Sequence, residues 1–268
     1  MTKISVVTVC YNSEKTIRKT ILSVLSQKYT NFEYIIIDGD SQDTTCNIID
    51  EMVIIAENYK IPFKVFSEKD KGVYDAMNKG ALRATGEYIL YMNSGDTFSS
   101  SDSLMNLCTG ININEYDVIY GDTLMSFSWG KIVNKPQKLT VNNPMPFIHQ
   151  SCLTKRSLLL KFPFNLKYKI IADHNLFYIL KINNYKFKYI STLVSEYDAS
   201  EGISSENPYL MYLEYDRIHG KNRNKLYPLV KIYYLIRYGL QEKIKKNIPS
   251  IIKEIIQKHR RSSAYLNK

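Results

Sequence analysis

The chain has 268 residues, of which 44% are apolar and 12% aromatic, so it can bury a large core and disorder is excluded as its overall description. Its net charge of +10 belongs to the C-terminal end: positions 217–268 hold 14 Lys and Arg against 2 Asp and Glu, and subtraction from the totals of 36 and 26 leaves 22 basic and 24 acidic residues in positions 1–216. A nearly neutral first part argues against a nucleic-acid-binding domain and indicates a local anionic partner for the tail.

The N-terminus, MTKISVVTVCYN, leads directly into a strand pattern and lacks the pattern of a signal peptide. The sequence contains no stretch of ~18 uncharged apolar residues, so we expect no membrane-spanning helix. The four cysteines show no CxxC pair and no zinc-like spacing with histidine, so we expect them to be reduced: Cys10, Cys46, Cys108 and Cys152. These features favour a cytoplasmic protein.

The first hundred residues alternate between strand and helix patterns. Apolar runs predict buried strands at Ile4–Val9, Tyr34–Ile37, Phe63–Phe66 and Glu87–Met92. Helical spacing predicts helices over 17–25, 48–56 and 72–84, the first of them capped by Asn12 or Ser13. Such alternation with short connections predicts a parallel sheet with right-handed crossovers, which binds ligands beyond the carboxyl ends of its strands.

Polar residues follow three of these strands at their carboxyl ends. They are Tyr11-Asn12, Asp38-Gly39-Asp40-Ser41 and Asn93-Ser94-Gly95-Asp96. We therefore expect the three strand ends to converge on one crevice. An acid after the second strand could accept hydrogen bonds from a base or a ribose, with turn formation and helix capping as the alternative. An acid after the fourth strand could share Mg²⁺ or Mn²⁺ with a diphosphate, with a simple turn as the alternative.

The helix over 72–84 has an apolar face and a polar face. Its polar face carries Asp75, Asn78 and Lys79. A solvated helix face accounts for Lys79 and for Arg83. Asp75 and Asn78 lie nearer the predicted sheet edge, so both a ligand contact and a solvated face stay open for them.

Beyond residue 100 the pattern predicts short strands at Tyr116–Tyr120 and Thr123–Phe127 around Gly121-Asp122, and another strand at Ile148–Leu153. Helices are predicted at Ala172–Ile182, Pro208–His219, Leu226–Leu240 and Ile248–Arg260. The last of these has isoleucines at helical spacing beside lysines and arginines. It could lie on an anionic membrane surface or dock its isoleucines on the rest of the protein, and both alternatives stay open.

A resemblance to glycosyltransferase family 2 is carried by two segments, SVVTVCYNSEKTIRKTILSVLSQKYTNFEYIIIDGDSQDTT and KGVYDAMNKGALRATGEYILYMNSGD. It covers roughly residues 3–200 and looks closest to the branch that assembles bacterial capsule, exopolysaccharide and O-antigen. It implies an α/β GT-A fold, with a mixed, mostly parallel sheet flanked by helices. It also implies an inverting transfer of one sugar from a nucleotide-diphosphate sugar, with UDP favoured, to a glycan or lipid-linked hydroxyl, assisted by Mg²⁺ or Mn²⁺.

The resemblance also implies roles for single residues. The metal falls to Asp96, because Asn93 and Gly95 stand where the family usually has acids. A third segment, MPFIHQSCLTKRSLLLKFPFNLKYKIIADHNLFYIL, resembles the acceptor side, where a helix-opening acid is the general base; Asp173 matches it, with a helix cap as its alternative role. His149 and Gln150 would line the acceptor pocket or touch the metal. The candidate donor-binding residues are Val9, Tyr11, Asp38 or Asp40, Asp75, Asn78, Asn93 and Ser94.

We thus expect a catalytic domain over 1–205, with a donor-binding half at 1–100 and an acceptor half at 101–205, and a basic helical extension over 206–268. Processive synthases are disfavoured because their QxxRW motif and membrane spans are not found in the sequence. Nucleotidylyltransferases are disfavoured because their Gly-rich N-terminal loop is missing. A catalytically inert relative that binds a nucleotide-sugar or a glycan remains the alternative.

Overall fold

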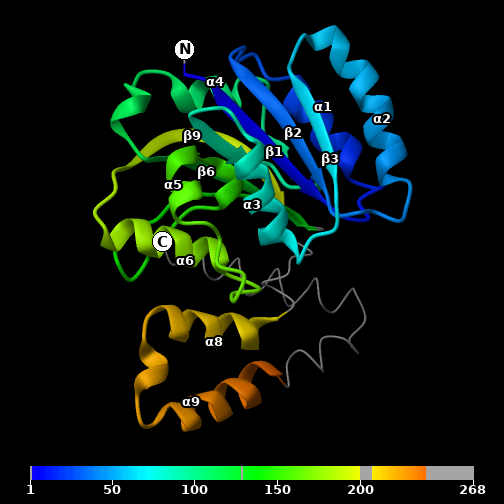
Figure 1. Ribbon diagram of the computed structural model, residues 1–268. Helices are drawn as coiled ribbons and strands as arrows, with labels where there is room; N and C mark the ends of the chain where they lie inside the picture. The colour runs from blue at the N-terminus through cyan, green and yellow to red at the C-terminus, as the bar shows by residue number, and fades with distance from the viewer. Residues whose placement is uncertain (1, 128, 200–206, 240–268) are drawn as a thin grey trace. The chain divides into compact units, whose positions relative to one another are not determined.

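The computed structural model describes residues 2–127, 129–199 and 207–239 (Figure 1). The chain divides into two compact units. The sheet unit comprises residues up to Met125 together with Ile132–Asp198, and the helical unit contains the described residues among 126–131 and after Asp198. The predicted boundary between residues 205 and 206 lies outside the described residues and stays a prediction.

The sheet unit is built on a mixed sheet of nine strands with the order β3-β2-β1-β4-β8-β6-β9-β5, and β7 pairs with β6. Its first half is parallel: β1 (Ile4–Cys10) lies between β2 (Phe32–Asp38) and β4 (Tyr88–Tyr91), and β3 (Phe63–Ser67) pairs with β2. Every residue of β1 and β2 is buried, as expected for parallel strands covered on both faces. The predicted parallel sheet is therefore confirmed.

The second half of the sheet contains antiparallel pairs. Here β8 (Cys152–Lys155) pairs with β4 and with β6 (Val118–Phe127), and β5 (Thr97–Phe98) pairs with β9 (Phe187–Asp198). The strand β7 is Gly130–Asn134. The predicted strand at Ile148–Leu153 is wrong in its first part, because His149–Ser151 form a 3-10 turn (η3) before β8 begins.

Strand structure is confirmed on both sides of Gly121-Asp122, but the predicted break between two strands is wrong, because Val118–Phe127 is one strand. Gly121 does not mark a turn. A Cβ at this position would lie 2.6 Å from Cγ2 of Val194 and 2.7 Å from the carbonyl oxygen of Thr192, both in β9. The glycine therefore allows the backbone of β6 to approach β9 closely.

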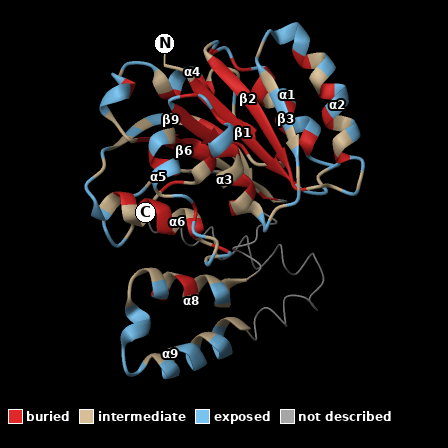
Figure 2. Cartoon of the chain, viewed as in Figure 1, coloured by how far each residue is buried: buried red, intermediate tan, exposed pale blue. Residues whose placement is uncertain are grey.

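Helices cover both faces of the sheet. Alternate residues of β1 point to opposite faces, so that Val6 joins one core cluster and Val7 the other. The first cluster includes side chains of α1 and α2, and the second those of α3 and α6. Figure 2 shows the central strands of this sandwich as almost entirely buried. The helices are α1 (Ile17–Leu25), α2 (Thr45–Ala56), α3 (Val73–Arg83), α4 (Ser103–Cys108), α5 (Arg156–Lys161) and α6 (Ala172–Ile182), with 3-10 turns η1 (Glu57–Tyr59) and η2 (Ile113–Glu115).

The predicted cap of the first helix is wrong, because α1 begins at Ile17 after Thr16. The side chain of Asn12 instead accepts a hydrogen bond from the Gln42 amide at 2.8 Å. The Ser13 amide donates to Oγ1 of Thr45 at 2.7 Å. These residues join the turn after β1 to the turn after β2, which positions the two strand ends relative to each other.

The helical unit contains α8 (Pro208–Ile218), the 3-10 turn η4 (Lys221–Arg223), α9 (Tyr227–Tyr234) and a π-helical continuation, η5 (Leu235–Gly239). A proline lies in the first turn of both α-helices, where its missing N–H is tolerated. The predicted helix Ile248–Arg260 lies outside the described residues. Within the described ranges, no helix combines the length and the apolar character that a bilayer crossing requires.

Candidate active site

The ends of β1, β2 and β4 lie side by side, as predicted from the polar residues that follow them. The space beyond them is called the crevice. The Gly39 amide donates to the carbonyl of Cys10 at 2.9 Å, and the Ser94 amide donates to the carbonyl of Val9 at 3.1 Å. The Asn12 amide donates to Oγ of Ser41 at 2.8 Å. The contact of Val9 is thus a backbone contact that holds the third polar turn beside the first.

Asp38 is fully buried and serves its own turn. Its Oδ2 accepts hydrogen bonds from the Ser41 amide (3.0 Å) and from Oγ of Ser67 (2.7 Å), and its Oδ1 accepts from Oγ of Ser41 (2.5 Å). Burial alone would raise the pKa of Asp38, but these hydrogen bonds outweigh burial and lower it. Asp40 is partly exposed and has a φ of +67°, so its position is the more accessible of the two.

Sequence reasoning missed Asp70, which lies over the end of β2. A Cβ at Gly39 would be 2.5 Å from Oδ2 of Asp70 and 3.4 Å from Cδ2 of Tyr11. Glycine at position 39 is therefore what lets a carboxylate and an aromatic ring approach this strand end together. Tyr11 is 60% exposed although it follows a fully buried strand. The signal in the sequence was the polar loop Lys69–Gly72, which follows β3, itself a parallel strand whose carboxyl end faces the crevice.

Asp75 and Asn78 are engaged in local structure. Oδ2 of Asp75 accepts a hydrogen bond from the Lys71 amide at 2.9 Å, which closes the first turn of α3. The amide group of Asn78 makes two hydrogen bonds of 2.9 Å with the backbone of Phe164, one donated and one accepted. Asn78 therefore fastens the segment before α6 to α3, and its role as a donor ligand stays a prediction.

A chain of hydrogen bonds joins the turn after β4 to the start of α6. Nδ2 of Asn93 lies 3.2 Å from Nε2 of His149, and Nδ1 of His149 lies 3.1 Å from Oδ2 of Asp173. The hydroxyl of Tyr74 donates to Oδ1 of Asp173 at 3.0 Å. The side chains of His149 and Asp173 are only 17% and 14% exposed. The structure thus brings together two predicted site regions that lie about eighty residues apart in the sequence.

Asp173 is the second residue of α6, and the cap position belongs to Ile171. The alternative role of Asp173 as the helix cap is therefore wrong. Burial would raise the pKa of the Asp173 carboxyl, but the hydrogen bond and the charge interaction with His149 outweigh burial and lower it. The group is consequently a carboxylate at neutral pH, with its two oxygens oriented from two sides.

Asp96 is 6% exposed, and its Oδ2 accepts a hydrogen bond of 2.6 Å from Nε2 of Gln150. Burial is the main cause that raises the pKa of Asp96 to about 7. Gly95 beside it has a φ of +101°, in the region that favours glycine, so an acid at that position would be strained. Oγ1 of Thr20 in α1 holds this turn by accepting from the Gly95 amide at 3.0 Å.

The residues around Asp96 fit a divalent cation that prefers oxygen ligands. In the described part of the chain, two buried side-chain oxygens have no hydrogen-bond partner near this turn: Oδ1 of Asn93 and Oε1 of Gln150. Together with the Asp96 carboxylate they form the kind of oxygen set that Mg²⁺ and Mn²⁺ use. Nowhere in that part do three His, Cys, Asp or Glu side chains gather as metal ligands. The contact of Gln150 with Asp96 agrees with the metal alternative for Gln150, and its acceptor role stays a prediction.

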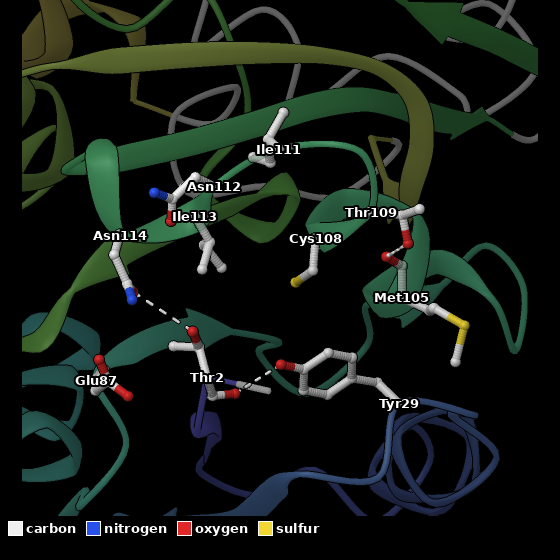
Figure 3. A pocket seen from close by; sticks show the side chains of 10 residues that line it. All are labelled: Thr2, Tyr29, Glu87, Met105, Cys108, Thr109, Ile111, Asn112, Ile113 and Asn114. Atoms are coloured by element: carbon white, nitrogen blue, oxygen red, sulfur yellow. Dashed lines mark hydrogen bonds between the residues drawn. The ribbon is translucent and has the colours of Figure 1, made fainter.

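A separate cavity of about 620 Å³ lies at the opposite end of the sheet (Figure 3). Thr2 and Glu87, which line it, precede β1 and β4, whereas the crevice lies after these strands. The hydroxyl of Tyr29 donates to the carbonyl of Thr2 at 2.6 Å across one wall. Because parallel sheets bind ligands at the carboxyl ends of their strands, we place the candidate site in the crevice.

The chain is similar to known proteins. The profile of glycosyl transferase family 2 matches residues 5–177. A PGL/p-HBAD biosynthesis glycosyltransferase of Mycobacterium bovis (strain BCG / Pasteur 1173P2) is 31% identical over 190 residues, which cover 68% of this chain and 72% of that protein. The UDP-Glc:alpha-D-GlcNAc-diphosphoundecaprenol beta-1,3-glucosyltransferase WfgD of Escherichia coli is 29% identical over 250 residues, which cover 88% of this chain and 91% of that protein.

Solved structures show the same fold at low identity. TarS of S. aureus in complex with UDP has a TM-score of 0.64 at 21% identity, over 81% of this chain and 64% of that chain. The mannosyltransferase PcManGT from Pyrobaculum calidifontis in complex with GDP-Man and Mn²⁺ has a TM-score of 0.63 at 14% identity, over 98% of this chain and 80% of that chain. The chain belongs to glycosyl transferase family 2 and is a glycosyltransferase with the GT-A α/β fold.

Proposed function

We propose that the enzyme transfers a single sugar, with inversion, from a UDP-sugar to a hydroxyl of a lipid-linked glycan during surface polysaccharide synthesis. The observation that carries this proposal is the hydrogen-bonded chain from Asn93 through His149 to Asp173, which puts an ionised, oriented carboxylate beside the turn that follows β4. WfgD, named for a UDP-Glc donor and a diphosphoundecaprenol-linked acceptor, is similar over 88% of the chain, which supports the choice of substrate class.

For the donor, we assign the nucleotide to the exposed ring of Tyr11 and the acids around Gly39. The ring offers a stacking face for a base, and Asp40 and Asp70 offer acceptors for a base N–H and for ribose hydroxyls. Asp38 supports the turn through its own hydrogen bonds and leaves recognition to its neighbours. Asn93 and Ser94 would face the diphosphate end. Complexes of TarS with UDP and UDP-GlcNAc support a UDP-linked donor for this fold.

Asp96, with Oδ1 of Asn93 and Oε1 of Gln150, would hold Mg²⁺ or Mn²⁺. When bound, such an ion neutralises the charge that develops on the leaving diphosphate. A carboxyl group must lose its proton to bind a metal ion. Burial opposes this at Asp96, because it raises the pKa of the side chain to about 7. We therefore expect cation binding and deprotonation of Asp96 to occur together.

For the chemical step, Asp173 acts as general base. The acceptor hydroxyl oxygen forms a bond to the anomeric carbon, the bond from that carbon to the diphosphate breaks with its electron pair leaving on the diphosphate, and the hydroxyl proton passes to the Asp173 carboxylate. His149 and Tyr74 orient this carboxylate by their hydrogen bonds. Attack from the face opposite the leaving group inverts the configuration at the anomeric carbon.

We place the reaction on the cytoplasmic face of a membrane. All four cysteines are free thiols, which suits a reducing compartment. A lipid-linked acceptor would require the enzyme to work at a membrane surface, and the excess positive charge of residues 217–268 is the feature that suits anionic lipids.

The replacement Asp173→Asn tests the proposal. It keeps the shape of the side chain and removes its basicity, so we expect transfer to fall by roughly 10²-fold or more while UDP affinity changes little. Asp102→Asn is the matched control, since its carboxylate pairs with Lys28 on the surface at 3.0 Å. Turnover by Asp173→Asn near that of the natural enzyme would move the base elsewhere.

A catalytically inert relative is the second candidate function, and one observation favours it. Asp96 is the only acid in the turn that follows β4. Such a protein would bind a UDP-sugar without hydrolysing it or transferring its sugar. Release of UDP from a panel of UDP-sugars, with acceptor present, therefore separates the two candidates.

A further inference from the structure

The helical unit exposes apolar side chains on one face of α9 and η5. Among the described residues of these two elements none is buried, and Figure 2 shows α9 without any buried position. The side chains of Leu229, Ile232 and Ile236 are 63%, 54% and 60% exposed. They recur at helical spacing and therefore share one face. A helix normally turns such a face toward another element, so this face lacks its usual protein contact within the helical unit.

The opposite face of α9 is the one that contacts α8. The ring of Tyr212 in α8 lies 5.3 Å from the ring of Tyr234 and 4.5 Å from that of Tyr238, measured between centroids. Tyrosines thus form the packed face, and leucine and isoleucine form the exposed one. Packing against protein would normally bury the leucine and isoleucine side chains rather than the tyrosines. Their exposure indicates that the apolar face meets a partner outside the helical unit.

The exposed charges of the described segment 207–239 have one sign. Between residues 207 and 239 the only acids are Glu214 and Asp216, and each is 2% exposed. The six basic residues of the same segment are all exposed: Arg217, Lys221, Arg223, Lys225, Lys231 and Arg237. Burial of both acids leaves a positive surface, which is complementary to an anionic partner.

A groove of about 730 Å³ joins the apolar face to the basic residues. Lys225 and Lys231 line it together with Asn222 and Asn224. Ile232 and Leu235 line its apolar part. Ammonium and amide donors suit phosphate oxygens, and the adjoining isoleucine and leucine suit acyl chains.

We propose that this region, the α9 surface (residues 221–239), binds the anionic leaflet of a lipid bilayer. Lys225 and Lys231 contact lipid phosphates, and Leu229, Ile232 and Ile236 enter the boundary between head groups and acyl chains. Membrane binding goes beyond the proposed reaction. It rests on that reaction only for its biological role, which is to bring the crevice to a lipid-linked acceptor. Membrane binding itself needs neither donor nor acceptor.

The test is sedimentation of the full-length protein with vesicles of phosphatidylcholine, with and without phosphatidylglycerol. We expect binding to the anionic vesicles that weakens as salt is added. Two double variants probe the α9 surface: Lys225→Glu with Lys231→Glu, and Leu229→Ser with Ile236→Ser. Each should reduce the partition coefficient by about tenfold or more. The residues after 239 are unchanged in both variants, so a loss belongs to the α9 surface.

The matched control is Lys135→Glu with Lys138→Glu, which changes the net charge equally at two exposed positions of the sheet unit and should bind like the natural protein. Equal binding by natural protein and α9 variants would overturn the proposal, as would no binding of the natural protein to anionic vesicles. A change of oligomeric state in the apolar variant, without loss of vesicle binding, would assign the surface to a protein contact instead. Asp173→Asn should bind vesicles normally, which separates failure of this inference from failure of the proposed reaction.

Discussion

At the scale of single residues, Asp96 is a buried acid that the protein only partly compensates. The hydrogen bond from Gln150 favours its charged form, but burial outweighs it and raises the pKa of Asp96 to about 7. A folded-state pKa above the unfolded value of ~3.9 means that the charge destabilises the fold increasingly from about pH 4 to about pH 7, and by a constant amount above that. A bound cation would remove this penalty, so that metal affinity and stability are linked through one carboxylate.

This linkage predicts the behaviour of Asp96→Asn. Without metal at pH 8 the variant should melt at or above the temperature of the natural protein, because it buries no charge. Its stabilisation by Mn²⁺, measured by thermal unfolding, should disappear. For the natural protein, Mn²⁺ affinity should fall by roughly tenfold per pH unit below about pH 7, as protons compete for the carboxylate. Unchanged Mn²⁺ stabilisation in Asp96→Asn would place the metal elsewhere.

Glu33 is the opposite case, a buried acid that the protein compensates well. Its side chain is 1% exposed, and it accepts hydrogen bonds from Oγ of Ser5 (2.7 Å), the Thr85 amide (2.6 Å) and Nζ of Lys64 (3.0 Å). Burial would raise the pKa of Glu33, but these contacts outweigh burial and lower it from 4.5 to about 2. Its stabilising effect is therefore present above about pH 4.5 and is lost as the pH falls toward 2.

Glu33→Gln should consequently reduce the free energy of unfolding by about 1–3 kcal/mol at pH 7. The difference between variant and natural protein should shrink as the pH falls from about 4.5 to about 2. Urea unfolding at several pH values measures this. A difference that stayed constant over that range would show that the charge of Glu33 contributes nothing.

At the scale of elements, the turn after β4 combines residues with different roles. Gly95 adopts a positive φ that an acid would resist, so the turn keeps one carboxylate, Asp96, and adds amide oxygens from Asn93 and Gln150. The turn is held from α1 by Thr20 and from η3 by Gln150 and His149. Its geometry therefore depends on two elements, α1 and η3, that are distant from it in the sequence.

The contact between β6 and β9 is a second element-scale feature. At Gly121 a methyl group would meet Val194 at 2.6 Å and the Thr192 carbonyl at 2.7 Å, and the backbone oxygen cannot move aside without disturbing the strand. We expect Gly121→Ala to cost about 1–3 kcal/mol of unfolding free energy in denaturant titrations. Val133→Ala on β7, at a position 42% exposed, is the control and should change stability by less than about 0.5 kcal/mol. A neutral Gly121→Ala would mean that the two strands separate easily.

At the scale of the whole molecule, ligand binding should increase the free energy of unfolding. A nucleotide at about 100 times its dissociation constant adds about 2.7 kcal/mol to the free energy of unfolding of the state that binds it. We expect UDP with Mn²⁺ to raise the melting temperature more than GDP or dTDP with Mn²⁺ does. Tyr11→Ala should reduce this gain, because it removes the exposed ring assigned to the base. A larger gain with GDP than with UDP would contradict the assignment of a UDP-sugar.

Local features of the sequence were sufficient for the parallel half of the sheet and for several helices. β1, β2 and β4 are apolar runs joined through nearby helices, so their pattern alone predicts their parallel arrangement and their common ligand edge. The bounds predicted for the helix Ala172–Ile182 agree with those of α6, and this places Asp173 in its first turn. The prediction that the three strand ends lie together was correct for the same reason.

The second half of the sheet and the roles of single acids were decided by tertiary contacts. Gly121 looked like a turn residue because nothing local records that Val194 would approach it. Asp38 and Asp40 could not be told apart by position, since Ser67, which binds Asp38, comes from another strand. Asp173 acquires its lowered pKa only when His149, which lies before β8, reaches it. Periodicity reports which face of an element is buried, whereas the proton affinity of a side chain depends on partners that only the folded chain brings within hydrogen-bonding distance.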